Sequence, residues 1–336
     1  MKETLLTGKM CLVTGASGFI GYHVAKQLVD AGARIRVLVR PTSNTKFLDS
    51  LPVEKCVGDI LDIPSIEKSL NGVEILFHVA GFVGFKESDG AMLRRVNVQG
   101  VKNVLGAAQQ SKVKRVVLTS SIAAIGASPT GELRDETHVW NDAVLHTAYS
   151  RSKRDGEMEA MKFYREGLPL VVVNPAFVFG ASDYGPSAAG IFLLKCLRGK
   201  IWASVPMGFN AVDVQDVARG HLLAAIKGRL GERYILANQN LTLIEFLRLL
   251  EKCGGAKAPR FHIPYPAVYG AACLFDAIGW LLRKDFILSR LHARRMKYDA
   301  WYSHKKASRE LGWVPRPVEE SFTETVRWFK EHHLSK

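Results

Sequence analysis

The first half of the chain alternates short, almost continuously apolar runs with longer stretches in which apolar residues recur every three or four positions. The runs are rich in Val, Ile and Leu, as expected for parallel strands that are buried on both faces. The six predicted strands are 9–15, 34–39, 53–58, 73–80, 115–120 and 168–175, and helical spacing is found at 20–31, 63–70 and 92–110. Strands that alternate with helices predict an α/β fold with a Rossmann-type, doubly wound parallel sheet.

After Pro175 this alternation of strands and helices breaks. Loops with Gly and Pro alternate with helices and with one short candidate strand, 233–237. We therefore predict an NADP-binding domain at 1–180 with returning segments near 205–240. A smaller, partly helical substrate lobe should comprise 181–204 and 241–336. The sequence has no clear linker between them, so the two parts should share one interface.

A glycine-rich turn follows the first predicted strand. The sequence "VTGASGFIG" places Gly15, Gly18 and Gly21 between that strand and a helix. Glycine lets the backbone turn tightly and approach a pyrophosphate, whose charge is stabilised by the helix N-terminus. The spacing is one residue longer than that of the standard G-x-G-x-x-G fingerprint. Its position between strand and helix predicts a dinucleotide site.

The end of the second predicted strand indicates which dinucleotide is bound. Arg40 stands there, 19 residues after Gly21, and no Asp or Glu is nearby. An acidic residue would bind a free ribose 2′-hydroxyl, whereas arginine pairs with a 2′-phosphate. Lys46, with Ser43, could complete a phosphate clamp. We expect NADPH as the cofactor, with NAD less favoured.

A tyrosine and a lysine four residues apart would share one face of a helix, where the ammonium lowers the pKa of the phenol. This spacing occurs three times, at Tyr22/Lys26, Tyr149/Lys153 and Tyr302/Lys306. Only Tyr149 falls between the fifth and sixth strands, at the start of a helix. Ser120 and Ser121 end the fifth strand at the sheet edge where ligands bind. The position predicts that Tyr149 donates a proton, while Lys153 lowers its pKa and holds the nicotinamide ribose.

Seven motifs carry a family resemblance: "TGASGFIG", "GDI", "HVAG", "VNVQG", "TSS", "YSRSK" and "NPAFVFG". Their order and spacing resemble the extended short-chain dehydrogenase/reductase family over essentially the whole chain. The chain is most similar to its dihydroflavonol-reductase-like and hopanoid-associated sugar-epimerase-like members. The resemblance implies that Ser121 is the catalytic serine, with Ser120 as second choice. The complete predicted cofactor-binding set is Gly15, Ser17, Gly18, Phe19, Ile20, Gly21, Arg40, Lys46, Asp59, Ile60, Val79, Ala80, Gly81, Thr119, Tyr149, Lys153, Pro175, Ala176 and Val178.

These residues predict an NADPH-dependent reductase of a ketone or aldehyde, with small and aromatic residues at 177–190 forming the mouth for a hydrophobic substrate. One alternative is a nucleotide-sugar epimerase or dehydratase that retains NAD. Arg40 argues against it, as does the absence of an acidic residue after Ser121. A basic clamp for a diphosphate is not obvious at 191–202, where Lys195, Arg198 and Lys200 are the candidates. The other alternative is a non-catalytic, cofactor-sensing regulator, which an intact Ser-Tyr-Lys set disfavours.

Composition excludes other classes of protein. Hydrophobic residues make up 47% and charged residues 23%, as in ordinary globular proteins. The net charge of +14 is not accompanied by a nucleic-acid-binding module, so no nucleic acid partner is expected. The five cysteines lack paired spacing, which predicts neither metal nor disulfides. No secretory signal precedes the first strand, so we expect a cytoplasmic protein.

Much of the basic excess follows an apolar stretch, 267–282, whose one charged residue is Asp276. As a helix it would be about 24 Å long, short of the roughly 30 Å hydrocarbon core, so we do not expect it to span a membrane. Two locations remain open. It is either a core or dimer-interface helix, or it lies on the anionic inner membrane surface as part of a peripheral contact through 267–297. We also expect a homodimer, paired through helices at 92–110 and 151–164.

Overall fold

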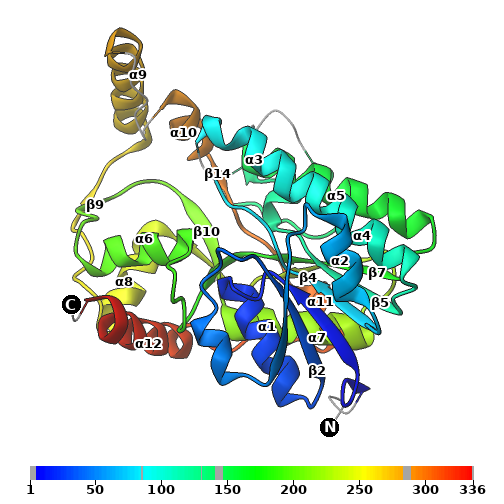
Figure 1. The fold of residues 1–336 in the computed structure, drawn as a ribbon. Coiled ribbons are helices and arrows are strands. Elements are labelled where there is room, and N and C mark those ends of the chain that lie inside the picture. The colour runs from blue at the N-terminus through cyan, green and yellow to red at the C-terminus, as the bar shows by residue number, and fades with distance from the viewer. Residues whose placement is uncertain (1–4, 85, 130, 141–146, 283–288, 335–336) are drawn as a thin grey trace.

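The computed structural model describes residues 5–84, 86–129, 131–140, 147–282 and 289–334 (Figure 1). Its main sheet has seven strands in the order β11-β7-β5-β4-β1-β2-β3, and every neighbouring pair is parallel. The strands are β1 (Met10–Thr14), β2 (Arg34–Val39), β3 (Val53–Val57), β4 (Ile75–His78), β5 (Arg115–Thr119), β7 (Leu170–Pro175) and β11 (Arg233–Leu236). The predicted parallel, doubly wound sheet is confirmed, and the short candidate strand becomes its seventh member.

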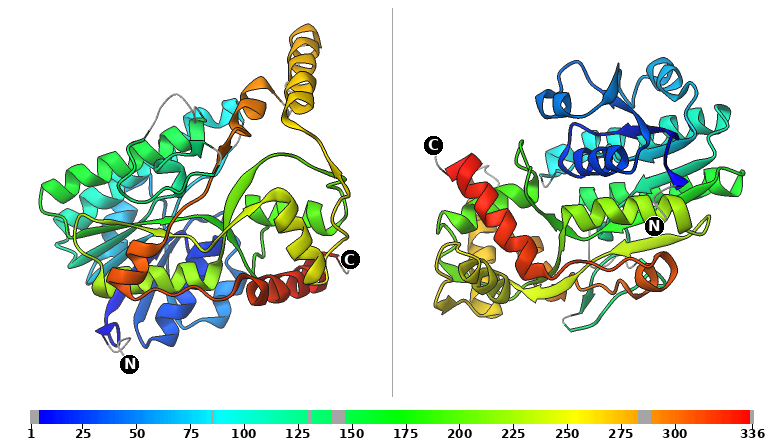
Figure 2. Two further views of the ribbon diagram at one scale, coloured as in Figure 1. Left: turned by 180° about the vertical axis from the view of Figure 1, so that it is seen from behind. Right: turned by 90° about the horizontal axis from the view of Figure 1, so that it is seen from below.

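Helices cover both faces of this sheet (Figures 1 and 2). One face carries α1 (Phe19–Asp30) and α7 (Val214–Lys227), and α11 (Lys305–Leu311) packs beside α7. The other face carries α2 (Ile63–Leu70), α4 (Gly100–Gln110) and α5 (Ala148–Arg165). Side chains of β7 alternate between the two faces, with Val171 and Val173 in one core and Leu170 and Val172 in the other. This explains why the strands are apolar at successive positions.

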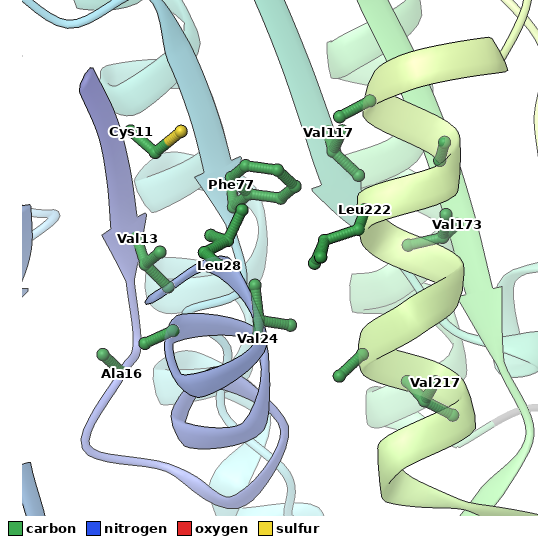
Figure 3. Close-up of a cluster of buried hydrophobic side chains, with 14 of the residues drawn as sticks. Cys11, Val13, Ala16, Val24, Leu28, Phe77, Val117, Val173, Val217 and Leu222 are labelled. Atoms are coloured by element: carbon green, nitrogen blue, oxygen red, sulfur yellow. The ribbon is translucent and has the colours of Figure 1, made fainter. Parts of the chain in front are cut away.

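Figure 3 shows the core beneath α1 and α7. Val24 and Leu28 of α1 and Leu222 of α7 point toward the sheet, where they meet Phe77 and Val117. All five side chains are almost completely buried. Burying an aliphatic or aromatic side chain of this size stabilises a fold by about 1.5–3 kcal/mol. The two helices therefore hold the strand ends, and with them the ligand-binding edge, in fixed positions.

The predicted substrate lobe is built around a second, three-stranded sheet. Its strands are β8 (Phe177–Phe179), β10 (Gly208–Asp213) and β12 (Gln239–Thr242), and its helices are α6 (Ala188–Leu197), α8 (Leu243–Lys252) and α12 (Val318–Phe329). Aromatic rings dominate its core, where Phe246 contacts Phe179, Phe209 and Phe322 at centroid distances of 5.1 to 5.3 Å. Short strand pairs, β9 (Ala203–Ser204) with β13 (Phe261–His262) and β6 (Ser128–Pro129) with β14 (Tyr298–Asp299), complete the connections.

Two features differ from the sequence expectation. Residues 92–110 do not form one helix but α3 (Gly90–Arg94), the π-helical turn η4 (Arg95–Gln99) and α4. Residues 305–313, which we assigned to the substrate lobe, return to the core of the first domain. There the buried Trp313 donates its indole N–H to the backbone oxygen of Asp216 at 2.8 Å.

The strand order places a ligand site at one edge. After β3 the chain crosses to the other side of β1 and continues with β4, so connections diverge between β1 and β4. In doubly wound sheets, ligands bind outside the carboxyl ends of the strands at this switch point. The substrate lobe follows β7 directly through β8, and it therefore closes over the same edge.

Candidate active site

The glycine-rich turn is shaped by close backbone contacts. Gly15 has a φ of +74°, and a Cβ there would lie 2.6 Å from the backbone nitrogen of Ala80. A Cβ on Gly21 would lie 2.2 Å from the oxygen of Gly15. Both positions therefore require glycine. Gly18 is the N-cap of α1 and supplies no side chain, so the helix can offer its first N–H groups to a phosphate.

A cleft of about 1310 Å³ runs along the carboxyl ends of the strands, from this turn to the substrate lobe. We call it the carboxyl-edge cleft. Every residue of the predicted cofactor-binding set lines it except two, Lys46 and Pro175. Lys46 is exposed at the start of the 3₁₀ helix η2 (Lys46–Ser50), and Pro175 is buried at the end of β7. The cleft is larger than a typical single-ligand pocket of roughly 300–1,000 Å³, so a dinucleotide and a substrate fit together.

Tyr149 is fixed by the start of α5. Thr147 caps this helix by accepting a hydrogen bond from the backbone N–H of Ser150 at 3.1 Å. The Tyr149 side chain reaches the carboxyl-edge cleft, which Ser121 also lines. Burial raises the pKa of the phenol, and the interaction with the Ser121 side chain opposes this only in part. We expected a lowered pKa from the lysine; burial is the larger influence because it disfavours the phenolate. The phenol is therefore protonated at neutral pH.

Lys153 lies one helical turn after Tyr149 and also faces the carboxyl-edge cleft. Its Nζ donates to the backbone oxygen of Thr119 at 3.4 Å. A Cβ on Gly81 would approach this nitrogen to 3.1 Å, so the glycine leaves room for the amine. Burial lowers the pKa of Lys153 to about 8, and the charge of Glu157 acts in the opposite direction.

Glu157 was not among the predicted site residues. It lies one further turn along α5 and is buried. Its carboxylate accepts from Ser120 Oγ at 2.5 Å and from Asn174 Nδ2 at 2.9 Å, and it pairs with Arg233 at 3.3 Å. Ser120 is thus bonded to Glu157, and Ser121 is the serine that meets Tyr149. The sequence signal that could have identified Glu157 is its position four residues after Lys153, which places both side chains on the same face of α5.

Asn97 is a second residue that sequence reasoning passed over, although it stands inside the "VNVQG" motif. It lies in η4, where a π-helical turn redirects the side chain from the face that a regular helix would give it. The amide donates to Ser152 Oγ and to the oxygen of Phe82, both at 2.9 Å, and accepts from the N–H of Phe82 at 2.8 Å. Asn97 therefore joins α5 to the loop after β4 that lines the cleft.

The other two Tyr-x-x-x-Lys copies have different surroundings. Tyr22 packs edge-on against Phe47 and Tyr184. Tyr302 lines the carboxyl-edge cleft, which its sequence position did not suggest, and its hydroxyl donates to the oxygen of Gly126. Its lysine, Lys306, is bonded to Glu232 at 2.6 Å. Of the three copies, only the one at Tyr149 has both its tyrosine and its lysine on the wall of the cleft.

The two ends of the carboxyl-edge cleft differ in polarity. At the nucleotide end, Arg40 is exposed and lines the cleft with Ser43. At the substrate end the wall is mainly apolar, and its larger apolar side chains include Ile122, Phe177, Phe192, Met207, Phe209 and Met296. Among the described residues 191–202, Phe192 lines the cleft, whereas Lys195, Arg198 and Lys200 do not.

Comparison with known proteins agrees with this geometry. Residues 11–237 match the NAD dependent epimerase/dehydratase family. The chain belongs to this family. It is therefore an NAD(P)-dependent oxidoreductase of the group that includes reductases, epimerases and dehydratases.

Several relatives cover almost the whole chain. A protein of Synechocystis sp. assigned as a dihydroflavonol 4-reductase is 33% identical over 96% of this chain and 95% of its own length. Sterol demethylase protein B of Methylococcus capsulatus is 34% identical over 96% and 99%. The crystal structure of gox2253 has a TM-score of 0.89 at 34% identity and covers 97% of this chain and 99% of that chain.

Proposed function

We propose that this enzyme is an NADPH-dependent reductase of a large, apolar ketone or aldehyde, working through Ser121, Tyr149 and Lys153. The observation that carries the proposal is the half-buried Tyr149 side chain, which lines the carboxyl-edge cleft together with Ser121 and Lys153. A proton donor must be protonated at the working pH and must lie where charge develops. The raised pKa of Tyr149 and its place in the cleft meet both conditions.

The three side chains divide the work of carbonyl reduction. Bound NADPH supplies the hydride that reduces the carbonyl carbon to an alcohol. Tyr149 gives its phenolic proton to the carbonyl oxygen, and the Ser121 hydroxyl hydrogen-bonds to that oxygen as negative charge develops. The Lys153 ammonium stabilises the phenolate that is left behind, and it lies beside Gly81, where the nicotinamide ribose would bind. Glu157 keeps the lysine charged by raising its pKa.

The preference for NADPH is supported by the nucleotide end of the cleft. Arg40 and Ser43 border the space outside β2, where the adenosine ribose is bound in this type of fold. An arginine at this position pairs with the 2′-phosphate of NADP. Lys46 does not line the cleft, so we assign the clamp to Arg40 and Ser43.

The substrate class is supported by the walls of the cleft. A nucleotide sugar brings a diphosphate, which is bound by basic side chains, and Lys195, Arg198 and Lys200 do not line the cleft. Aromatic and aliphatic side chains instead suit a hydrophobic ring system. The names of two relatives, a dihydroflavonol reductase and a sterol demethylase protein, agree with a substrate of this kind.

The test is NADPH oxidation with a panel of carbonyl compounds that runs from small polar ketones to polycyclic ones. We expect turnover to increase with apolar size, and we expect Tyr149→Phe to lower kcat by about 10²–10⁴-fold while NADPH still binds. Tyr22→Phe is the matched control, because Tyr22 has the same spacing to a lysine but packs outside the site. Tightly held NAD with turnover of a nucleotide sugar would show an epimerase instead. Equal activity of Tyr149→Phe and the wild type would disprove the assigned proton donor.

A further inference from the structure

Helix α9 (Tyr265–Leu282) stands away from the rest of the molecule (Figures 1 and 2). Of the residues of this fully described helix, Val268 and Ala272 alone are buried. The helix has a mean hydropathy of 1.3. Its distal half exposes Leu274, Phe275, Trp280, Leu281 and Leu282, with Trp280 84% accessible. A projecting apolar helix in water needs a partner.

The exposed apolar side chains surround the helix. At about 100° per residue, Trp280 and Leu282 point roughly 200° apart, and Leu281 lies between them. A helix that docks on one protein surface shows a single apolar stripe, whereas a helix that is apolar all round lies in an apolar medium. Its one charged residue, Asp276, is paired with Arg290 at 2.7 Å. The arrangement suits insertion into lipid better than contact with a second copy of this chain.

The ion pair also limits how deeply the helix can insert. With 18 residues α9 is about 27 Å long, close to the hydrocarbon thickness of a bilayer. However, Arg290 is tied to Asp276 near the middle of the helix, so the chain has returned to the protein side by residue 290. Beyond Asp276 the helix extends six residues, about 9 Å. This matches the 5–10 Å depth of helices that enter only the interfacial layer.

Basic residues gather at the base of this projection. Arg290 and Arg294 of α10 (Arg290–Arg295) are exposed, and Lys297 follows them with its Nζ 4.8 Å from the ring centroid of Tyr265 in α9. The whole chain carries a net charge of +14. Cations placed just behind an apolar tip are positioned for the phosphates of anionic lipids. Charge complementarity therefore selects an anionic membrane as the partner.

We propose that the end of α9 beyond Asp276 inserts into the interfacial layer of an anionic membrane while Arg290, Arg294 and Lys297 contact the lipid headgroups. Val268 and Ala272 of α9 pack with Met296, which also lines the substrate end of the carboxyl-edge cleft. Tyr298, two residues on, lines it as well. Docking therefore brings the apolar end of the cleft next to the bilayer. A lipid-dissolved substrate could enter there, a consequence that rests on the proposed function, whereas the docking itself does not.

The experiment is flotation of the full chain with phosphatidylcholine vesicles that contain or lack phosphatidylglycerol. We expect the wild type to float with the anionic vesicles at low salt and to be released at high salt. Trp280→Ser/Leu281→Ser should abolish flotation, with Val314→Ser, at an exposed apolar residue outside α9, as control. Arg294→Glu/Lys297→Glu should lower binding at least about tenfold. The exposed pair Arg34→Glu/Lys102→Glu makes the same change in net charge elsewhere and should have less effect.

A second measurement does not depend on the folding of the serine variants. Brominated lipid should quench the tryptophan emission of the wild type more than that of Trp280→Phe, because Trp280 enters the bilayer. Wild type that stays unbound on anionic vesicles at low salt would overturn the proposal. So would a solution dimer that Trp280→Ser/Leu281→Ser converts to a monomer, since a second copy would then cover the helix. NADPH oxidation of a soluble ketone, measured without vesicles, reports separately on the proposed function.

Discussion

Arg40 is a single residue on which the choice of cofactor depends. It is exposed at the end of β2 and lines the cleft, whereas Lys46, six residues on, is exposed but does not line it. Arg40→Glu should weaken NADPH relative to NADH by about 10–100-fold, because a charge-assisted bond to the 2′-phosphate is replaced by repulsion. The ratio of kcat/KM for the two cofactors measures this.

Lys46→Glu is the matched control for that change, since it alters the charge by the same amount outside the cleft. Its effect on the cofactor ratio should be small and should fall with added salt. If Lys46→Glu changes the ratio as strongly as Arg40→Glu, the two residues share the phosphate. If neither variant changes it, the enzyme uses NAD, and the cofactor proposal is wrong.

The residue scale also shows what sequence reasoning can reach. The position of Tyr149 between the fifth and sixth strands distinguished it from Tyr22 and Tyr302, and in the structure both Tyr149 and Lys153 line the cleft. The direction of its pKa could not be predicted, because that direction depends on burial by residues distant in sequence. The two adjacent serines were also hard to separate until Glu157 was seen to bond Ser120.

At the scale of elements, one face of α5 carries the site. Tyr149, Lys153 and Glu157 follow at intervals of four, so their side chains lie along one stripe. Tyr149 and Lys153 line the cleft, whereas Glu157 is buried beneath it and accepts a hydrogen bond from Ser120. Helix periodicity predicts such a stripe. It could not predict η4, because a π-helical turn changes the period within an apolar pattern that otherwise suggests one helix.

The stripe on α5 makes a prediction about pH. Burial lowers the pKa of Lys153 to about 8 and the charge of Glu157 raises it, so Glu157→Gln should lower it further. Lys153 then loses its proton at a lower pH, and the alkaline limb of the kcat profile for carbonyl reduction should move toward neutrality. Steady-state rates between pH 6 and 10 measure this shift.

Glu159→Gln serves as the control on the same helix, because Glu159 pairs with Lys162 on the outer surface. It should leave the profile unchanged. A Glu157→Gln enzyme with lower activity but an unmoved alkaline limb would show that Glu157 acts only through Ser120 and Asn174. A shift toward higher pH would contradict the assigned charge interaction.

At the scale of the whole molecule, the sequence predicted the architecture better than the boundaries. Buried strands and amphipathic helices are local patterns, and they identified the doubly wound sheet. Residues 305–313 return to the core of the first domain because of contacts with residues distant in sequence, since Trp313 packs beside α7. The apolar run at 267–282 was found from composition, but only the structure showed that it projects from the molecule.

Buried histidines link the stability of the whole molecule to pH. Burial lowers the pKa of His23 to about 4, of His78 to about 3 and of His221 to about 4. Each histidine is neutral in the folded chain at neutral pH but has a pKa near 6.5 when the chain is unfolded. Between the folded-state pKa and 6.5 the unfolded state therefore binds more protons. The free energy of unfolding falls as pH drops below about 6.5. At pH 5 the loss is roughly 2 kcal/mol per histidine. Asp183, whose pKa burial raises to about 6, offsets part of it.

Urea unfolding of the cofactor-free chain at pH 7 and pH 5 tests this, with His221→Gln as the informative variant. In the wild type, the ring of His221 bonds Thr119 Oγ1 and the oxygen of Val217, both at 2.8 Å, so the variant should be less stable at pH 7. Its loss of stability between pH 7 and pH 5 should nevertheless be smaller, since an amide takes up no proton. His332→Gln, on the exposed C-terminal turn, should keep the wild-type pH dependence. An unchanged pH dependence in His221→Gln would mean that its imidazole is already charged in the fold, which its complete burial makes too costly.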